Sequence, residues 1–145
     1  MTINRQTIVA EARDWIGTPY RHQASLKGVG CDCLGLVRGV WRSVIGDEPE
    51  RAPAYAPDWA EAAGGESLAE AAARHLIAIG RDKFREGDVL LFRWRDQLPA
   101  KHAAIVTASD KIVHAHDGAA IAEVALAPWW RRRIAYAFRF PGVDA

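Results

Sequence analysis

The apolar residues change their period partway along the chain, and this change restricts the possible folds more than any other feature of the sequence. Before about residue 80 they recur with the 3.6-residue period of an amphipathic helix, and after it they alternate with the two-residue period of a strand. Helices followed by strands favour an α+β fold over a doubly wound parallel sheet. With 145 residues, of which 50% are hydrophobic, the chain is long enough for one domain, 1–145, with its own core.

The helix predicted after residue 32 has the widest apolar face. Asp32 is suited to cap its start and Gly46 its end, which places Cys33 in the first helical turn. Its apolar positions are Leu36, Val37, Val40, Trp41, Val44 and Ile45. We expect this face to pack on a sheet.

Two further helices are predicted on either side of it. The first covers 5–16, with Asn4 as its cap and Gly17 at its end. The other begins at Ser67-Leu-Ala-Glu70, which has the form of a capping box, and ends near Gly80.

Five strands are predicted in the second half of the chain, over 88–94, 102–109, 111–116, 120–126 and 133–140. Short turns separate several of them, so sequential antiparallel pairing is the simplest topology. The last strand should place four bulky side chains on one face, against the helix after residue 32: Ile134, Tyr136, Phe138 and Phe140. The stretches 18–32 and 47–65, which contain glycine and proline, are predicted as loops.

Composition and charge exclude several classes of protein. The formal net charge of +1 is too small to favour nucleic acid or a membrane surface as a partner. No apolar run approaches the roughly 20 residues that span a bilayer. The first residues lack the order of a signal peptide, so we expect synthesis in the cytoplasm without an export signal and no membrane insertion. Cys31 and Cys33 are too close together for a useful disulfide loop, which argues against a disulfide-rich secreted scaffold.

Cys33 lies where a glycine-containing loop meets the start of the apolar helix. A thiol attacks as its thiolate, and the partial positive charge of a helix start favours that anion. We therefore expect a lowered thiol pKa and predict Cys33 as the nucleophile of a hydrolase or acyl-transfer enzyme. Cys31, in the loop, is predicted to be a structural thiol.

A cysteine nucleophile needs a base and a group that orients the base. His102 begins an apolar strand and is the predicted base, while His114 lies in the next strand, close enough across a tight turn to touch it. His116 shares a face with His114 and remains an alternative, because periodicity does not separate the two. We prefer His114, which is inside the strand. The backbone N–H of Cys33 and the hydroxyl of Tyr20 are candidate oxyanion donors.

These residues stand within motifs that together resemble the NlpC/p60 family of papain-like cell-wall cysteine peptidases. The motifs are Gly17-Thr-Pro-Tyr20, Asp32-Cys-Leu-Gly-Leu-Val37, Gly87-Asp-Val-Leu-Leu-Phe92, His102-Ala-Ala-Ile-Val106 and Ile112-Val-His-Ala115. Leu34 departs from the family, which usually has Ser after the nucleophile. The stretch 20–33 is most similar to the branch found in phage tails and phage-like gene-transfer particles.

The resemblance implies Cys33 as nucleophile, His102 as base and His114 as third polar residue, with Tyr20 and Asp32 as oxyanion or substrate-binding residues. It implies a papain-like NlpC fold, with N-terminal helices packed on a C-terminal antiparallel sheet of about five strands. The implied substrate is the peptidoglycan stem peptide, cleaved between D-γ-glutamyl and diaminopimelate or lysine, with no metal or organic cofactor. The phage-like branch implies other tail-tip proteins as partners and action on the wall from a virion or particle tail.

Two other classes of function remain open. Cys31, Cys33, His114 and His116 offer two thiols and two imidazoles to zinc, although a single residue between the cysteines is shorter than structural zinc sites usually have. The second open class is a structural tail-tip component without turnover. Trp129 and Trp130 either line a carbohydrate or peptide groove or are buried at the sheet edge.

Overall fold

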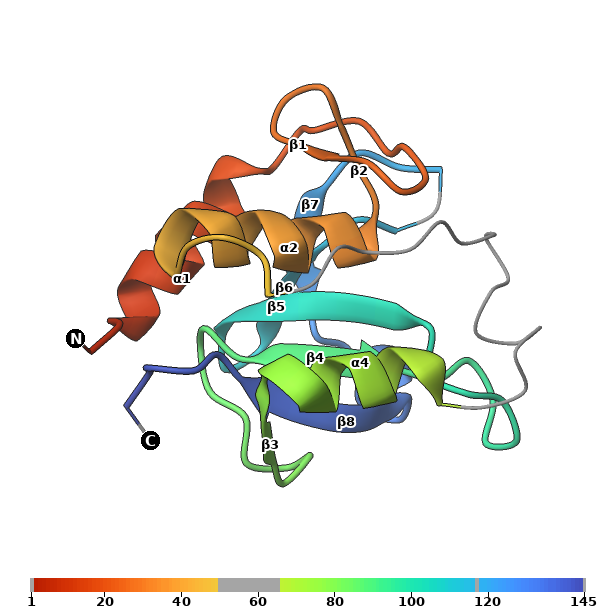
Figure 1. Cartoon of the computed structure of the whole chain (residues 1–145). Coiled ribbons are helices and arrows are strands. Elements are labelled where there is room, and N and C mark those ends of the chain that lie inside the picture. The colour runs from red at the N-terminus through yellow and green to blue at the C-terminus, as the bar shows by residue number, and fades with distance from the viewer. Residues whose placement is uncertain (1, 50–65, 117, 145) are drawn as a thin grey trace.

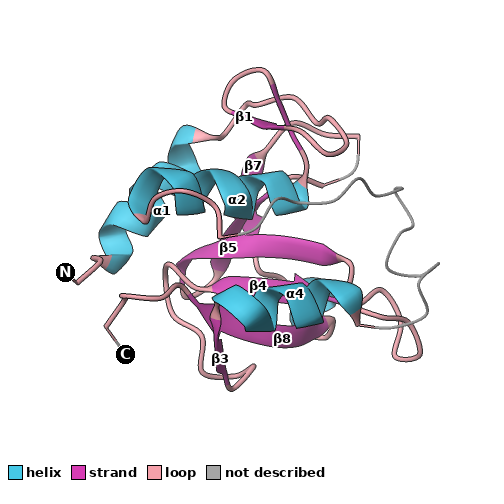
Figure 2. Cartoon of the chain, in the orientation of Figure 1, coloured by secondary structure: helices cyan, strands magenta, loops and turns pink. Residues whose placement is uncertain are grey.

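The computed structural model describes residues 2–49, 66–116 and 118–144 and has the predicted α+β architecture. Three helices lie over one face of a six-stranded antiparallel sheet (Figures 1 and 2). They are α1 (Arg5–Asp14), α2 (Cys33–Val44) and α4 (Ser67–His75). The short helix α5 (Pro128–Arg131) is not predicted from the sequence. The predicted loop 47–65 lies almost entirely outside the described residues.

The starts of α1 and α2 are capped as predicted. Asn4 accepts a hydrogen bond from the backbone N–H of Gln6, and Asp32 accepts one from Gly35. These side chains satisfy N–H groups that have no partner within their own helix, which explains why the helices begin where they do.

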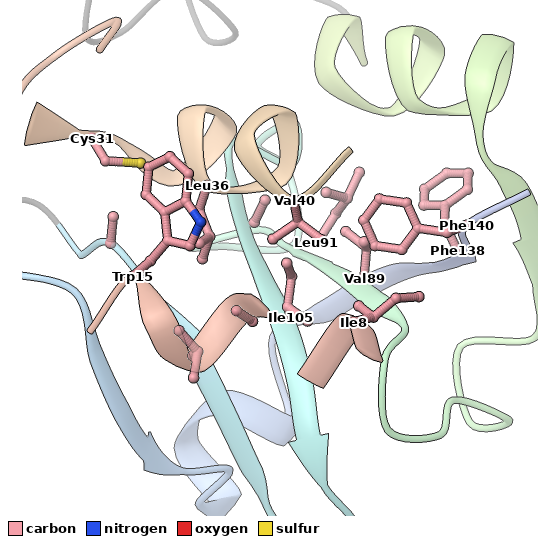
Figure 3. Packing of buried hydrophobic residues seen from close by; sticks show 14 of the residues in the cluster. Ile8, Trp15, Cys31, Leu36, Val40, Val89, Leu91, Ile105, Phe138 and Phe140 are labelled. Atoms are coloured by element: carbon pink, nitrogen blue, oxygen red, sulfur yellow. The ribbon is translucent and has the colours of Figure 1, made fainter. Parts of the chain in front are cut away.

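The packing of α2 on α1 depends on a glycine. A Cβ added at Gly39 would lie 2.1 Å from Trp15 Cζ2, so the indole of Trp15 occupies the space that a larger residue would need. Trp15 belongs to the core cluster shown in Figure 3. Its indole N–H donates to Glu11 on α1, which fixes the ring (2.9 Å).

Gly39→Ala is expected to lower the free energy of unfolding by about 1–3 kcal/mol, because overpacking outweighs the better helix propensity of alanine. Urea unfolding measures the change. The same substitution in a Trp15→Leu background should cost much less, since the crowding indole is gone. An equal cost in both backgrounds would show that the contact with Trp15 is not the cause.

The helix α4 differs from its prediction at both ends. Its N-cap is Glu66, without a side-chain capping hydrogen bond, so Ser67 does not form the expected capping box. The Glu66 carboxylate instead accepts hydrogen bonds from Arg93 and from the backbone of Ala100, both at 3.2 Å. The helix ends at His75 rather than near Gly80 because the following residues pair with a strand of the sheet.

The sheet has the strand order β3-β8-β4-β5-β6-β7, with every neighbouring pair antiparallel. The strands are β3 (Ile77–Ile79), β4 (Val89–Phe92), β5 (His102–Ala108), β6 (Lys111–His114), β7 (Ala122–Ala125) and β8 (Ile134–Arg139). Sequential pairing is confirmed for β4 to β7. It is wrong for β8, which returns across the sheet and lies between β3 and β4. A small hairpin of β1 (Ser25–Leu26) and β2 (Gly30–Cys31) interrupts the predicted loop 18–32.

The two faces of the sheet carry separate core clusters. The helix-side cluster includes Val89, Leu91, Ala103, Ile105 and Val113, which alternate along β4, β5 and β6 and pack against α1 and α2 (Figure 3). The far-side cluster consists of the intervening residues, together with residues that follow β7: Leu90, Phe92, Ala104, Val106, Ile112, Leu126, Ile134 and Ala137.

One predicted member of the helix-side face is therefore wrong. Phe138 and Phe140 lie in the helix-side cluster as predicted, and Tyr136 packs against it, but Ile134 lies in the far-side cluster. An irregularity in the pairing of β4 with β8, between Leu91 and Phe92, reverses the alternation at this point.

The two ends of the described chain are joined to each other. Ile3 forms a bridge with Val143, and its N–H donates to the carbonyl of Gly142 (2.8 Å). Arg5 forms a largely buried ion pair with Asp88 (2.8 Å) and also donates to the carbonyl of Asp144. Figure 1 shows both termini on the side of the molecule where α2 ends, away from its start at Cys33.

Candidate active site

The start of α2 is locked to the preceding loop through Asp32. One carboxylate oxygen accepts the N–H of Gly35 and the other accepts the N–H of Gln23, both at 2.7 Å. Gly35 allows this close approach, because a Cβ there would lie 2.0 Å from the carbonyl oxygen of Ala24. The residue before Cys33 thus fixes both the loop and the helix, which gives the thiol a defined position.

The sulfur of Cys33 lies against the beginning of β5. The half-buried thiol donates to the carbonyl of Lys101 at 3.9 Å, and the backbone N–H of Ala103 also points to the sulfur. These two residues flank His102 in the chain. The structure therefore brings the predicted nucleophile to the strand segment that carries the predicted base.

His102 and His114 form a direct pair, as the predicted turn between their strands implies. His102 Nε2 and His114 Nδ1 are 2.8 Å apart, and both side chains are buried. His116, the alternative third residue, is exposed and stacks on His114 instead of bonding to His102. The arrangement favours His114 as the group that orients the His102 ring.

The His102 side chain lies on the far side of the sheet, whereas the Cys33 thiol lies on the helix side. His102 is paired with Phe92, a far-side residue, whereas Cys33 packs on the helix side. Among the described residues, the hydrogen bond of the thiol is to Lys101 and not to the imidazole. His114 engages Nε2 of His102, and Nδ1, the ring nitrogen nearer to the backbone, is the one that this hydrogen bond does not use.

The thiol is not activated in the way the helix start predicts. Burial, together with the nearby charge of Asp32, raises the pKa of the Cys33 thiol to about 12. Burial and the charges of His114 and His116 hold the pKa of His102 well below its ordinary value. The expectation of a lowered thiol pKa is wrong because desolvation outweighs the helix dipole. The directions of the two shifts favour a neutral thiol and a neutral imidazole.

Alkylation of Cys33 by iodoacetamide is consequently expected to be slow at pH 7 and to accelerate about tenfold per pH unit as the thiolate fraction rises. Intact-protein mass spectrometry of the Cys31→Ala variant would follow Cys33 alone. Fast labelling at pH 6–7, independent of pH, would instead indicate a thiolate–imidazolium pair.

Tyr20 lies beside the same loop. Its backbone forms a bridge with Cys31, and its half-buried ring packs against the helix-side cluster. A role for its hydroxyl beside an oxyanion stays a prediction. Both carboxylate oxygens of Asp32 accept backbone N–H groups, which supports a positioning role. A substrate-binding role for Asp32 stays a prediction.

Cys31 is a buried thiol whose sulfur donates to the carbonyl of Asp32 (3.1 Å). Burial, with Asp32 and Cys33 nearby, raises its pKa to about 12, which suits the predicted structural role. Within the described ranges, His, Cys, Asp and Glu side chains form no group of three or more that would hold a metal ion. The geometry thus gives no support to a zinc site built from Cys31, Cys33, His114 and His116.

Aromatic rings that the sequence did not assign to the site surround the histidines. Trp94 stacks on His102 with centroids 5.4 Å apart, and Trp130 contacts His102, His114 and His116 at 5.1–5.6 Å. The signal available in the sequence is that Trp94 closely follows Phe92, the strand partner of His102. Of the two adjacent tryptophans, Trp130 is half-buried among these rings, whereas Trp129 is 44% exposed.

An α+β domain in which helices pack on one face of an antiparallel sheet has a papain-like fold. The sequence profile of the NlpC/P60 family matches residues 17–139, and the chain belongs to this family. Members of the family are generally cysteine peptidases that act on peptidoglycan. The comparison with curated protein sequences gave no significant match.

Several solved structures share the fold. The crystal structure of the NlpC/p60 domain of the peptidoglycan hydrolase SagA is 24% identical, with a TM-score of 0.64, covering 95% of this chain and 100% of that one. An NlpC/P60 family protein from Bacillus cereus is 19% identical, with a TM-score of 0.68 over 97% of this chain and 41% of that one. NlpC2 from Trichomonas vaginalis is 15% identical, with a TM-score of 0.65 over 94% of this chain and 46% of that one. The chain thus spans less than half the length of the last two.

Across the described ranges, no helix combines the length and the apolar character needed to cross a bilayer.

Proposed function

We propose that this protein is a peptidoglycan endopeptidase that cleaves stem peptides through Cys33, at the bond between D-γ-glutamyl and diaminopimelate or lysine. The observation that carries the proposal is the placement of the Cys33 sulfur against the start of β5, the strand segment that carries His102, whose ring is hydrogen-bonded to His114. Membership of the NlpC/P60 family supports the substrate class. The choice of bond rests on the resemblance of the sequence motifs to those of this family.

The neutral resting groups favour a general-base mechanism. A tautomer of His102 with its proton on Nε2 donates to His114 Nδ1, which leaves the Nδ1 lone pair free to accept the thiol proton. As the proton moves to Nδ1, the sulfur attacks the stem-peptide carbonyl and a tetrahedral oxyanion forms, met by the Cys33 N–H and the Tyr20 hydroxyl.

The second half of the reaction returns the enzyme to its starting state. The C–N bond breaks as His102 gives the Nδ1 proton to the leaving amine, and a thioester to Cys33 remains. Water then attacks the thioester while His102 takes one of its protons. The C–S bond breaks, the carboxylic acid leaves, and the proton returns to the sulfur.

Digestion of purified peptidoglycan, with mass analysis of the released fragments, tests this proposal. Fragments that end in D-γ-glutamate, and new free amines on the diamino acid, are expected with the unchanged chain. Their absence under conditions where the protein is folded would favour the non-catalytic alternative.

We further propose that the chain acts from the tail of a phage-like particle, beside other tail-tip proteins, and reaches the wall from outside. This proposal rests on the sequence of 20–33 alone, an argument by likeness. Mass spectrometry of purified particles should detect the chain at a fixed ratio to tail proteins. Its presence only in the producing cell would contradict the proposal.

A further inference from the structure

We propose that Arg133 determines which diamino acid the candidate site accepts. Its guanidinium, held against Trp129, binds the free carboxylate of diaminopimelate on the leaving side of the scissile bond, so that diaminopimelate stem peptides are preferred over lysine stem peptides. The inference rests on the proposed function and narrows its substrate class.

The leaving half of the substrate belongs on the His102 side of the reacting carbonyl. In the proposed mechanism His102 gives a proton to the leaving amine, whereas Cys33 bonds to the acyl half. The diamino acid provides that amine, so we expect its side chain to extend among the neighbours of the His102 ring. A residue that selects the diamino acid must therefore lie near this ring.

Two tryptophans lead from the His102 ring to the surface. Trp94 stacks on His102 with centroids 5.4 Å apart, and Trp129 contacts Trp94 with centroids 6.1 Å apart. The outer ring, Trp129, is 44% exposed. The aliphatic part of a diamino acid can pack on such a ring, which would bring the far end of its side chain to the groups that surround Trp129.

Trp129 holds the guanidinium of Arg133 in a fixed position. The Cζ atom of Arg133 lies 3.7 Å from the centroid of the indole, and Nη1 donates to the carbonyl of Trp129 at 2.8 Å. Nε is buried without a hydrogen-bond partner among the described residues, and Nη2 makes no hydrogen bond to any of them. A stacked guanidinium with unused N–H donors is preorganised to bind a carboxylate.

The register of the sheet places Arg133 at the same end of the sheet as His102. Phe92 pairs with His102 on one side and with Ile134 on the other. One residue further along, the backbone N–H of Arg93 donates to the carbonyl of Arg133 at 3.0 Å. Arg133 is thus separated from the predicted base by a single intervening strand, β4.

The positive charge of Arg133 is not neutralised within the part of the chain that the structure describes, where no carboxylate forms an ion pair with it. Glu66, the acid closest to the neighbouring Arg93, pairs with that residue at 3.2 Å. The exposed turn between β4 and β5 contributes one charge of each sign, from Arg95 and Asp96. Two further charged residues flank the histidines in the chain: Lys101, and Asp117, which lies outside the described residues.

Diaminopimelate and lysine differ in one free group. The far end of the diaminopimelate side chain carries an ammonium and a carboxylate, whereas that of lysine carries the ammonium alone. A fixed guanidinium attracts the carboxylate through charge-assisted hydrogen bonds and repels a lone ammonium. The cation at Arg133 therefore favours diaminopimelate.

Two tripeptides test the proposal: L-alanyl-γ-D-glutamyl-meso-diaminopimelate and L-alanyl-γ-D-glutamyl-L-lysine. Calorimetry gives their dissociation constants with the full-length Cys33→Ala chain, which cannot form the thioester. We expect the diaminopimelate peptide to bind about tenfold more tightly or better, and Arg133→Gln in this background to bring the ratio close to one. Arg133→Lys should retain part of the preference, because the charge stays while the planar pair of donors is lost. The kcat/KM values of the chain with Cys33 should show the same preference.

Arg132→Gln is the matched control, since it removes an exposed cation that is the chain neighbour of Arg133, and it should leave the ratio as it is. Circular dichroism checks that each variant is folded. Equal binding of the two peptides, tighter binding of the lysine peptide, no binding of either, or a preference that survives Arg133→Gln would overturn the proposal. If the chain with Cys33 cleaves neither peptide, the proposed function fails, and the dissociation constants still decide the role of Arg133.

Discussion

Cys33→Ala is expected to abolish the release of stem-peptide fragments from peptidoglycan, with a fall in turnover of about 10⁴-fold or more, the scale seen when a nucleophile that acts as a unit with its base is removed. The loss is confined to the chemistry, because Asp32 holds the start of α2 through backbone contacts that do not involve the sulfur. Near-ultraviolet circular dichroism and the thermal unfolding midpoint should therefore stay close to those of the unchanged chain.

Cys31→Ala is the matched control, since both thiols lie in the same short segment. Cys31 is completely buried, so its removal should cost stability, on the order of 1 kcal/mol or more, and leave turnover largely intact. Full activity in Cys33→Ala would remove Cys33 from the proposed role. Equal losses of activity in the two variants, in step with unfolding, would point to a structural effect.

The free energy of unfolding is expected to fall as the pH is lowered from 7 to 4.5. Burial and the charge of His116 lower the pKa of His114 from 6.5 to about 4, and His102 shifts in the same direction. The unfolded chain then binds protons that the folded chain does not, so stability is complete above pH 6.5 and is lost below it. At pH 4.5 the loss from His114 alone is on the order of 2 kcal/mol.

Urea unfolding at several pH values measures this dependence, and His114→Gln should reduce its slope between pH 6.5 and 5, leaving the contribution of His102. Carboxylates affect the pH dependence of the free energy of unfolding mainly below pH 5. The pKa values of Glu11, Glu48, Glu66 and Glu123 are lowered because, although burial opposes it, hydrogen bonds and cations favour the charged form. Their stabilisation is lost only below about pH 4.5. A flat profile from pH 7 to 5 would contradict the buried, neutral state of the histidine pair.

The parts of the site that were predictable are those set by neighbours in the chain. The position of Cys33 at a helix start follows from the Asp32 cap and the apolar period after it, both local signals. The contact of His102 with His114 follows from a tight turn between successive strands. Neither needs knowledge of the rest of the fold.

The remainder depends on contacts that a linear pattern does not contain. The pairing of β8 with β4 joins segments far apart in the chain, and it leaves β4 between β8 and β5. The capping box at Ser67 failed because Glu66 found partners in Arg93 and Ala100, residues far along the chain. The thiol pKa depends on burial, which only the packed structure determines.

The bridge between Ile3 and Val143 holds the two ends of the described chain next to each other. A circular permutant, in which a short peptide joins these two ends and new ends are opened elsewhere on the surface, would keep the same packing contacts. Polypeptides attached at either end would project from the side of the molecule where α2 ends. They would leave the side at Cys33 unobstructed. The fold is thus suited to insertion into a longer polypeptide.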